Sequence, residues 1–174
     1  MEFLTAAQCS AWLKHRAIHE APYGIKIPTR TRYLQFAPPN RRNCRAFVAA
    51  LFGTAGDFSG ALLQLTDWVW YPEDEPDPMA AFRESSGESR PLIEVPGFQV
   101  DRTELRLAID LGALIVTRGW TGYVYLESRA ATFLLWEGDL IDFWTKEKGV
   151  VERLRAVLQE AGARVVHDRG NSAV

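Results

Sequence analysis

The sequence predicts a single α+β domain, built on an antiparallel or mixed sheet with helices packed on one or both faces. Helical and extended patterns are mixed along the 174 residues, and hairpin-like strand pairs are expected at 23–37 and 123–136. Hydrophobic residues make up 47% of the chain, and no repeat or composition break marks a domain boundary. We therefore expect one domain over residues 1–167 and a frayed tail over residues 168–174.

The first 52 residues are expected to form two helices separated by extended chain. A helix over residues 5–18 is predicted because Thr5 and Gln8 have the spacing of a capping box. A second helix over residues 41–52, capped by Asn40, carries apolar residues at helical spacing. The two extended runs between these helices are residues 23–27 and 31–37.

Residues 61–71 form the clearest strand pattern in the first half of the chain. They are almost continuously aliphatic and aromatic, which is typical of a central strand covered on both faces. Residues 72–78 contain three prolines and four acids, so they cannot continue this strand. We expect a short helix over residues 79–85 and a short strand over residues 92–95.

The second half is expected to contain another capped helix and a hairpin. Asp101, with Glu104 three residues later, caps a predicted helix that ends before Gly119. Residues 123–126 and 131–136 are predicted to form the hairpin. The remaining expected elements are a short helical piece over residues 138–144, a helix over residues 150–161 and a last strand over residues 164–167.

Charge is distributed unevenly, although the formal net charge is only −2. Residues 1–45 carry eight bases and two acids, whereas residues 46–110 carry twelve acids and four bases. Residues 111–174 are balanced. Such blocks bear on the choice of partner more than on the fold, because a summed electrostatic field steers association without specifying architecture.

No combination of nucleophile, base and metal ligand stands out. His15 and His19 would share a helix face, but no third ligand follows, so we expect no metal and no cofactor. Cys9 and Cys44 fall on apolar helix faces and are expected to be buried and unreactive. A small hydrolase with a carboxylate site or a Cys9–His15 pair stays open as an alternative.

The stretch from Arg30 to Arg45 interleaves five arginines with Tyr33 and Phe36, a combination that contacts phosphates and stacks on bases. It makes a nucleic-acid-binding accessory protein a further alternative. The isoelectric point of about 5.9 argues against that reading, because nucleic-acid-binding domains are usually basic. The opposing interpretation is a solvated helix face that pairs with the acidic middle of the same chain.

In the most unusual segment, large aromatic residues are followed directly by a run of acids. Aromatic side chains are favoured at interface centres, and neighbouring carboxylates would speed association with a basic partner. The alternative is that the aromatics belong to the core of a strand and the acids to a solvated loop. The candidate partner-binding residues are Trp68, Trp70, Tyr71, Glu73, Asp74, Glu75 and Asp77.

Several aromatic and turn positions carry a resemblance to known proteins. They are Gly119-Trp120-x-Gly122-Tyr123, the hairpin 123–136, the run 137–144, and the stretch from Arg83-Glu84-Ser85 to Pro96-Gly97. In these positions the chain resembles small bacterial α+β proteins, some of which look like immunity partners of secreted toxins. The resemblance implies a protein-binding role and assigns no functional residue.

Together these patterns favour a non-catalytic binding protein over an enzyme. We expect it to be cytoplasmic, because the chain shows no signal sequence, no apolar run of about 20 residues and only two cysteines. The expected partner is a basic protein, such as a toxin, and neither a membrane nor a nucleic acid. The sequence predicts no oligomeric state.

Overall fold

The computed structural model describes residues 1–20, 31–39, 43–67, 77–127 and 131–169 and confirms the α+β fold. The strands are β1 (Glu2–Leu4), β2 (Arg32–Ala37), β3 (Gly60–Asp67), β4 (Gly97–Asp101), β5 (Thr121–Leu126), β6 (Thr132–Trp136), β7 (Leu140–Thr145) and β8 (Arg164–Asp168). The helices are α1 (Ala6–His15), α2 (Cys44–Thr54), α3 (Asp77–Ser85), α4 (Leu105–Arg118) and α5 (Lys148–Ala161), with a 3-10 turn η3 (Arg102–Glu104) before α4.

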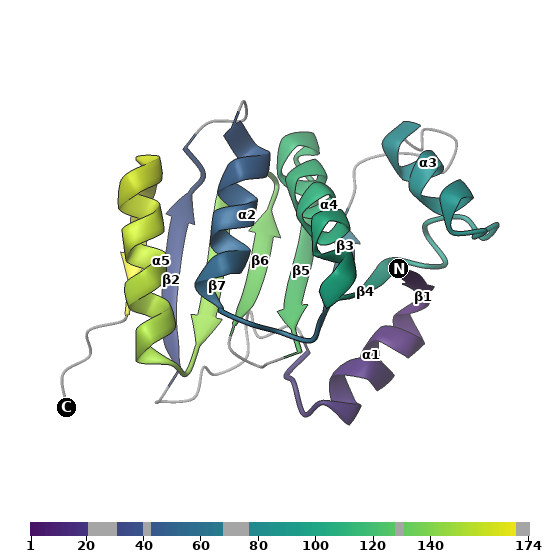
Figure 1. The fold of residues 1–174 in the computed structure, drawn as a ribbon, viewed down its shortest axis with the longest axis horizontal. Coiled ribbons are helices and arrows are strands. Elements are labelled where there is room, and N and C mark those ends of the chain that lie inside the picture. Colours follow the sequence, from purple (N-terminus) through teal and green to yellow (C-terminus); the bar gives the residue numbers. More distant parts are fainter. Residues whose placement is uncertain (21–30, 40–42, 68–76, 128–130, 170–174) are drawn as a thin grey trace.

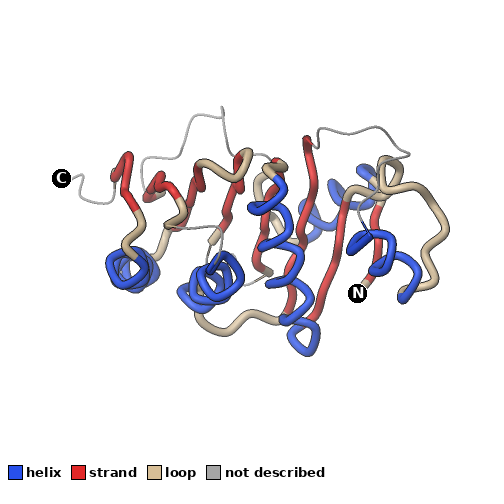
Figure 2. Tube along the Cα trace, turned by 90° about the horizontal axis from the view of Figure 1, so that it is seen from above, coloured by secondary structure: helices blue, strands red, loops and turns tan. Residues whose placement is uncertain are grey.

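The eight strands of the described residues belong to one antiparallel sheet, in the order β1-β4-β3-β5-β6-β7-β2-β8. Three helices, α2, α4 and α5, lie together on one face of this sheet, which we call the helix face (Figure 1; Figure 2). Helix α2 packs between the other two. The large apolar core lies between these helices and the sheet.

The opposite face of the sheet is different in character, and we call it the polar-aromatic face. Residues directly opposite one another in antiparallel strands project to the same face, so the register defines which side chains share it. One row across six strands is Gln64, Tyr123, Leu134, Asp142, Gln35 and His167. A second row is Leu62, Tyr125, Thr132, Trp144 and Tyr33. Helix α1 packs on this face through Cys9, Trp12 and Leu13.

The predicted helix ends are confirmed where capping chemistry was visible in the sequence. Thr5 and Gln8 form the capping box that begins α1, and Asp101 and Glu104 form the one that begins η3 and leads into α4. Gly119 ends α4 with φ +71°, in the left-handed region that glycine adopts without steric cost. Helix α5 ends in the same way, at Gly162.

The short helical piece expected over residues 138–144 is wrong, because these residues lead into and form strand β7. Glu137 and Gly138 both have positive φ, and the amide of Asp139 donates to the carbonyl of Trp136. These are the features of a tight hairpin turn, in which residues 137–139 connect the paired Trp136 and Leu140 and fold β7 back against β6. The continuous apolar run has no clear period, so it fits a helix and a buried strand equally well.

Two further differences lie at the other end of the sheet. Residues 92–95 form a turn, closed by the amide of Val95 donating to the carbonyl of Leu92, and the strand follows them as β4. Strand β1 was not expected, because three residues are too few for a pattern. The expected strand over residues 23–27 and the cap at Asn40 lie outside the described residues. No helix in the described part of the chain is both long and apolar enough to cross a bilayer.

Gly97 marks the close approach of α1 to the sheet. A Cβ on Gly97 would overlap the Cys9 Sγ and lie 3.1 Å from the Leu4 Cβ. We predict that Gly97→Ala lowers the free energy of unfolding by about 1–3 kcal/mol, because the packed α1 cannot move away without loss of contacts. Urea denaturation measures the change.

Gly53→Ala is the matched control, since nothing lies within 4 Å of the added methyl group in α2. It is expected to be neutral or to stabilise the protein by about 0.5 kcal/mol. Equal effects of the two variants would contradict the close approach at Gly97.

Candidate functional site

Most of the predicted partner-binding residues lie in the connection between β3 and α3. Trp68, Trp70, Tyr71, Glu73, Asp74 and Glu75 lie outside the described residues. Asp77 is the first residue of α3. The strand that was expected to run to residue 71 is described as far as Asp67, the last residue of β3. The interface role of the aromatic residues that follow Asp67 therefore stays a prediction, with the core of a strand as its alternative.

The described elements around this segment present exposed acids. Asp67 at the end of β3, Glu84 in α3 and Glu94 in the loop before β4 are exposed and form no ion pair with any described residue. Ile93, beside Glu94, is 60% exposed, more than any other large hydrophobic residue described. We call Asp67, Glu84, Ile93 and Glu94 the acidic surface.

Several arginines of the basic N-terminal block are held by groups of the same chain. The Arg45 Nε lies 2.5 Å from the Asp110 Oδ1, and the Arg16 Nε lies 2.7 Å from the Glu127 Oε1. Arg32 donates to the carbonyl of Lys146. Arg45 and Arg32 belong to the stretch considered for nucleic acid, whereas Arg30, Arg41 and Arg42 lie outside the described residues. Pairing of the basic block with acids elsewhere in the chain is therefore observed at Arg16 and Arg45, and Arg45 pairs with an acid of the acidic middle of the chain.

Arg16 shows how this protein accommodates a guanidinium. Its Cζ lies 4.1 Å from the centroid of the Trp12 ring, a cation–π contact, while its Nε contacts Glu127. The Ser59 hydroxyl also donates to Glu127, at 2.8 Å. This hydroxyl and the Arg16 guanidinium together lower the pKa of Glu127. An aromatic ring and a carboxylate thus hold one arginine between α1 and the end of β5.

A second polar cluster lies on the polar-aromatic face, centred on Asp142 of β7. The Tyr33 hydroxyl donates to the Asp142 Oδ1 at 2.6 Å, and the Gln35 Nε2 donates to the same oxygen at 2.9 Å. The Tyr33 ring packs against Trp144 and His167, with centroid separations of 5.5 and 5.7 Å. Asp142 is fully buried, and this burial raises its pKa against the opposing effect of the two hydrogen bonds.

Buried polar atoms without a partner gather on this same face. Among the described residues they are the Gln64 Oε1, the Asp142 Oδ2, the Trp144 Nε1 and the Trp12 Nε1. The first three project from β3 and β7, and Trp12 comes from α1, which packs on this face. A buried polar atom that lacks a hydrogen bond costs free energy. This face therefore has unused hydrogen-bonding capacity at four described side chains.

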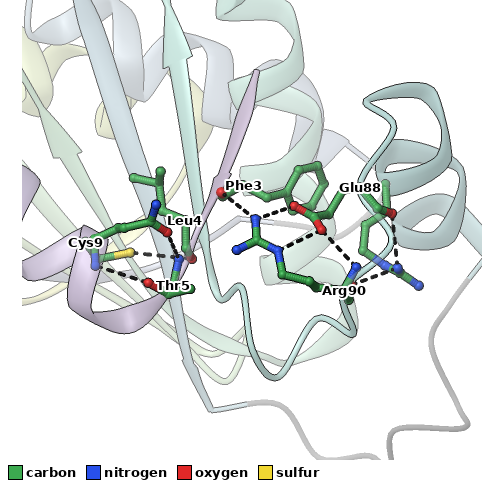
Figure 3. Close-up of polar contacts among 8 residues, drawn as sticks. Phe3, Leu4, Thr5, Cys9, Glu88 and Arg90 are labelled. Carbon is green, nitrogen blue, oxygen red and sulfur yellow. Dashed lines mark hydrogen bonds and ion pairs between the residues drawn. The ribbon is translucent and has the colours of Figure 1, made fainter.

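The two cysteines are buried, as expected. Cys9 is fully buried, with its Sγ 4.0 Å from the carbonyl oxygen of Leu4 (Figure 3), and burial is the main cause that raises its pKa to about 11. Cys44 lines a shallow hollow of about 410 Å³ at the end of β2, yet it is only 3% exposed and its pKa is also raised by burial. These thiols do not have the accessible, low-pKa character of a nucleophile.

Neither a pair of histidines nor a cluster of carboxylates forms a metal site among the described residues. No three histidine, cysteine, aspartate or glutamate side chains converge there. His15 is exposed near the end of α1, and His19 is exposed after it. His167 is exposed on β8, where its Nε2 accepts from the Arg169 Nε at 2.9 Å.

The sequence did not single out the Asp142 cluster, because its strand was expected to be helical. A local signal was present, because Glu137-Gly138 lies between two apolar runs. A glycine in that position is typical of a tight hairpin turn between two strands. Asp142 in an otherwise apolar strand would then have marked a buried acid. Its partners Tyr33 and Gln35 are two residues apart in β2 and so lie on the same face of that strand.

Comparisons with protein-family models, with curated proteins and with solved structures find no match to this chain. The geometry of its own residues is therefore the basis for assigning a function.

We predict that Asp142 makes stability depend on pH. Its pKa in the folded protein is raised above the ordinary 3.8, so the folded state binds more protons than the unfolded chain above that pH. The contribution of this carboxyl to stability is therefore complete below pH 3.8 and is lost as the pH rises through the folded pKa. Urea denaturation of wild type and Asp142→Asn at several pH values from about 4 to about 7 measures this.

The expected result is a free-energy advantage of wild type over Asp142→Asn that shrinks as the pH rises. Tyr33→Phe removes one hydrogen bond that favours the ionised carboxylate, so it should steepen the loss of stability with pH. A difference between wild type and Asp142→Asn that stays constant over this range would contradict a raised pKa.

We also predict that neither thiol reacts readily in the native protein. An aromatic disulfide reagent at neutral pH should label Cys9 and Cys44 at least about tenfold more slowly in the folded protein than in denaturant, because both are buried and protonated. The single variants Cys9→Ala and Cys44→Ala assign any residual reaction to one thiol. Labelling of either native thiol at the denatured rate would show that it is accessible.

Proposed function

We propose that this chain is a non-catalytic cytoplasmic binding protein of the immunity type, which neutralises a basic protein partner. The partner would contact the segment from Trp68 to Asp77 together with the acidic surface that flanks it. One observation carries the proposal most directly. Asp67 on β3 and Glu84 on α3, the elements that hold the two ends of this segment, are exposed acids that form no ion pair with any described residue. The same is true of Glu94, which follows the exposed Ile93 in the loop before β4.

The chemistry of such a surface favours a basic partner. Carboxylates at the rim of an interface raise the association rate of a positively charged protein, and aromatic side chains at its centre supply most of the binding free energy. The sequence places Trp68, Trp70 and Tyr71 immediately before the acids of the segment. The Arg16 contacts with Trp12 and Glu127 are an example, within this chain, of the aromatic and carboxylate environment that a partner arginine would meet.

The alternative of a hydrolase gains no support from the groups that were considered for it. The Cys9 thiol is fully buried and has a raised pKa. Among the described carboxyl groups, Asp142 is the one that is buried and held by hydrogen bonds, but it has no exposed surface with which to contact a substrate. We therefore assign Asp142 a structural role, in which it joins β7 to β2.

Neutralising the acids of the segment tests the proposal. We predict that Glu73→Gln, Asp74→Asn, Glu75→Gln and Asp77→Asn together slow association with the basic partner by about tenfold or more at low ionic strength and flatten its salt dependence. The partner is first captured from the host with the wild-type protein and identified, and association rates are then measured with the purified pair. On this proposal the four carboxylates face solvent in the free protein, so the melting temperature should barely change.

A matched control removes the same charge from α5 and from the other end of β3. Glu147→Gln, Glu152→Gln, Glu160→Gln and Asp57→Asn change exposed acids that lie in or just before α5 or ahead of the first residue of β3, so association should slow much less. An acidic captured partner, or equal slowing by both sets of substitutions, would overturn the proposal.

A further inference from the structure

One large apolar side chain of the acidic surface stands apart from the core. Ile93 is 60% exposed, whereas Leu92 and Val95 on either side of it are buried in the main core. The other exposed large hydrophobic residues of the described chain, Val165 and Val166, lie on β8 at the far end of the sheet. Ile93 therefore faces solvent from a stretch of chain that the core holds in place.

Ile93 and Glu94 are the central residues of a hydrogen-bonded turn. The amide of Val95 donates to the carbonyl of Leu92 at 3.1 Å, and the amide of Glu94 donates to the carbonyl of Pro91 at 2.9 Å. Turn centres favour glycine, proline, asparagine, aspartate and serine, so the turn itself gives no reason for a β-branched isoleucine. The core gives none either, because the side chain of Ile93 lies outside it. This isoleucine is thus explained neither by local structure nor by packing.

Two arginines tie the loop before this turn to the elements on either side of it. Arg83 of α3 donates from its Nη1 to the carbonyl of Arg90 at 2.9 Å, and the carbonyl of Arg83 accepts from the amide of Glu88 at 2.9 Å. Arg90 donates from its Nη2 to the carbonyl of Phe3 in β1 at 3.4 Å (Figure 3). The loop that leads into the turn is therefore connected both to α3 and to the edge of the sheet.

Glu88 fixes the guanidinium of Arg90. The Glu88 Oε2 lies 2.5 Å from the Arg90 Nη2, and the Glu88 Oε1 accepts from the Nε and the backbone amide of Arg90 at 2.9 and 2.8 Å (Figure 3). The hydrogen bonds from Arg90 lower the pKa of Glu88 to about 2, so the carboxylate stays ionised at neutral pH. A surface that is ordered before its partner arrives loses less entropy on binding. We call these contacts the Arg90 network, and they order the chain that carries Ile93.

Two exposed acids accompany Ile93. Glu94 follows it directly in the turn. The amide of Leu65 in β3 donates to the carbonyl of Pro96, just after the turn, at 2.9 Å, so Asp67 at the end of β3 also lies close to the turn. Neither acid forms an ion pair with a described residue. Carboxylates beside an exposed apolar side chain are complementary to an apolar pocket with a basic rim.

We propose that Ile93, on a turn ordered by the Arg90 network, is an apolar anchor that enters a pocket of the basic partner, and that arginine or lysine side chains form the rim of this pocket. The inference rests on the proposed function and adds to it a contact point outside the segment from Trp68 to Asp77. A buried apolar contact acts mainly on the dissociation rate, whereas rim charges act mainly on the association rate. Ile93 should therefore control how long the complex lasts.

Binding kinetics with the purified basic partner, captured and identified as described above, test the inference. Ile93→Ala should raise the dissociation rate constant by about tenfold or more, because it removes most of the apolar contact. The association rate constant and its salt dependence should stay within about twofold of wild type, since no charge changes. The melting temperature should stay unchanged, because the side chain is exposed.

Arg90→Gln tests the ordering of the turn, because it keeps Ile93 and removes the charge that Glu88 holds. We expect faster amide hydrogen exchange over residues 92–95 and dissociation that is faster by about threefold or more. Faster exchange with unchanged dissociation would overturn the role assigned to the Arg90 network.

Val165→Ala is the matched control, because it truncates another exposed β-branched side chain at the far end of the sheet, and it should leave dissociation unchanged. Equal acceleration by Val165→Ala and Ile93→Ala would overturn the inference. Unchanged dissociation in Ile93→Ala, with association still slowed by neutralising the segment, would overturn it and leave the proposed function standing. An acidic captured partner, or the capture of no protein, would overturn both together.

Discussion

Strand β7 pairs with β6 on one side and with β2 on the other, and this two-sided pairing holds the sheet together. Strands β2 and β8 join the other strands only through β7 in the described sheet. Asp142 lies at this seam and accepts from Tyr33 and Gln35 of β2. A shift of one residue in the register of β7 would turn the Asp142 carboxyl into the apolar core beneath α2 and α5, away from its hydrogen-bond donors Tyr33 and Gln35. The buried acid therefore fixes the register at a cost in stability.

The helices and several strands were predictable because their signals are local. Capping boxes at Thr5 and Asp101 and left-handed glycines at Gly119 and Gly162 define helix ends within a few residues. The hairpin of β5 with β6 and the last strand β8 were predicted in the same way. In contrast, β7 is buried on both faces and its sequence has no clear period, so only its partners β6 and β2, one of them far away in the chain, make it a strand.

The polar-aromatic face could not be predicted for the same reason. Its rows join residues from six strands, and their order in the sheet differs from their order in the chain. Tyr33 and Gln35 are more than a hundred residues from Asp142, so no local pattern connects them. The acidic surface is partly a sequence property, because the block of acids is visible in the chain. Which other acids of the block are paired, as Asp110 is with Arg45, follows only from the fold.

Some charged residues of the chain pair with one another and stabilise the fold. Others stay unpaired at the surface and are available to a partner. Arg16 and Arg45 stabilise the contacts of α1 and α2 with distant acids, whereas Asp67, Glu84 and Glu94 remain available around the segment from Trp68 to Asp77. Amide hydrogen exchange of the purified protein, with and without its captured basic partner, tests this division most directly. Added protection over residues 67–77 and 84–94, with β2, β7 and β8 unchanged, is the predicted result. Protection confined to β8 or to the polar-aromatic face, with residues 67–77 unaffected, would contradict it.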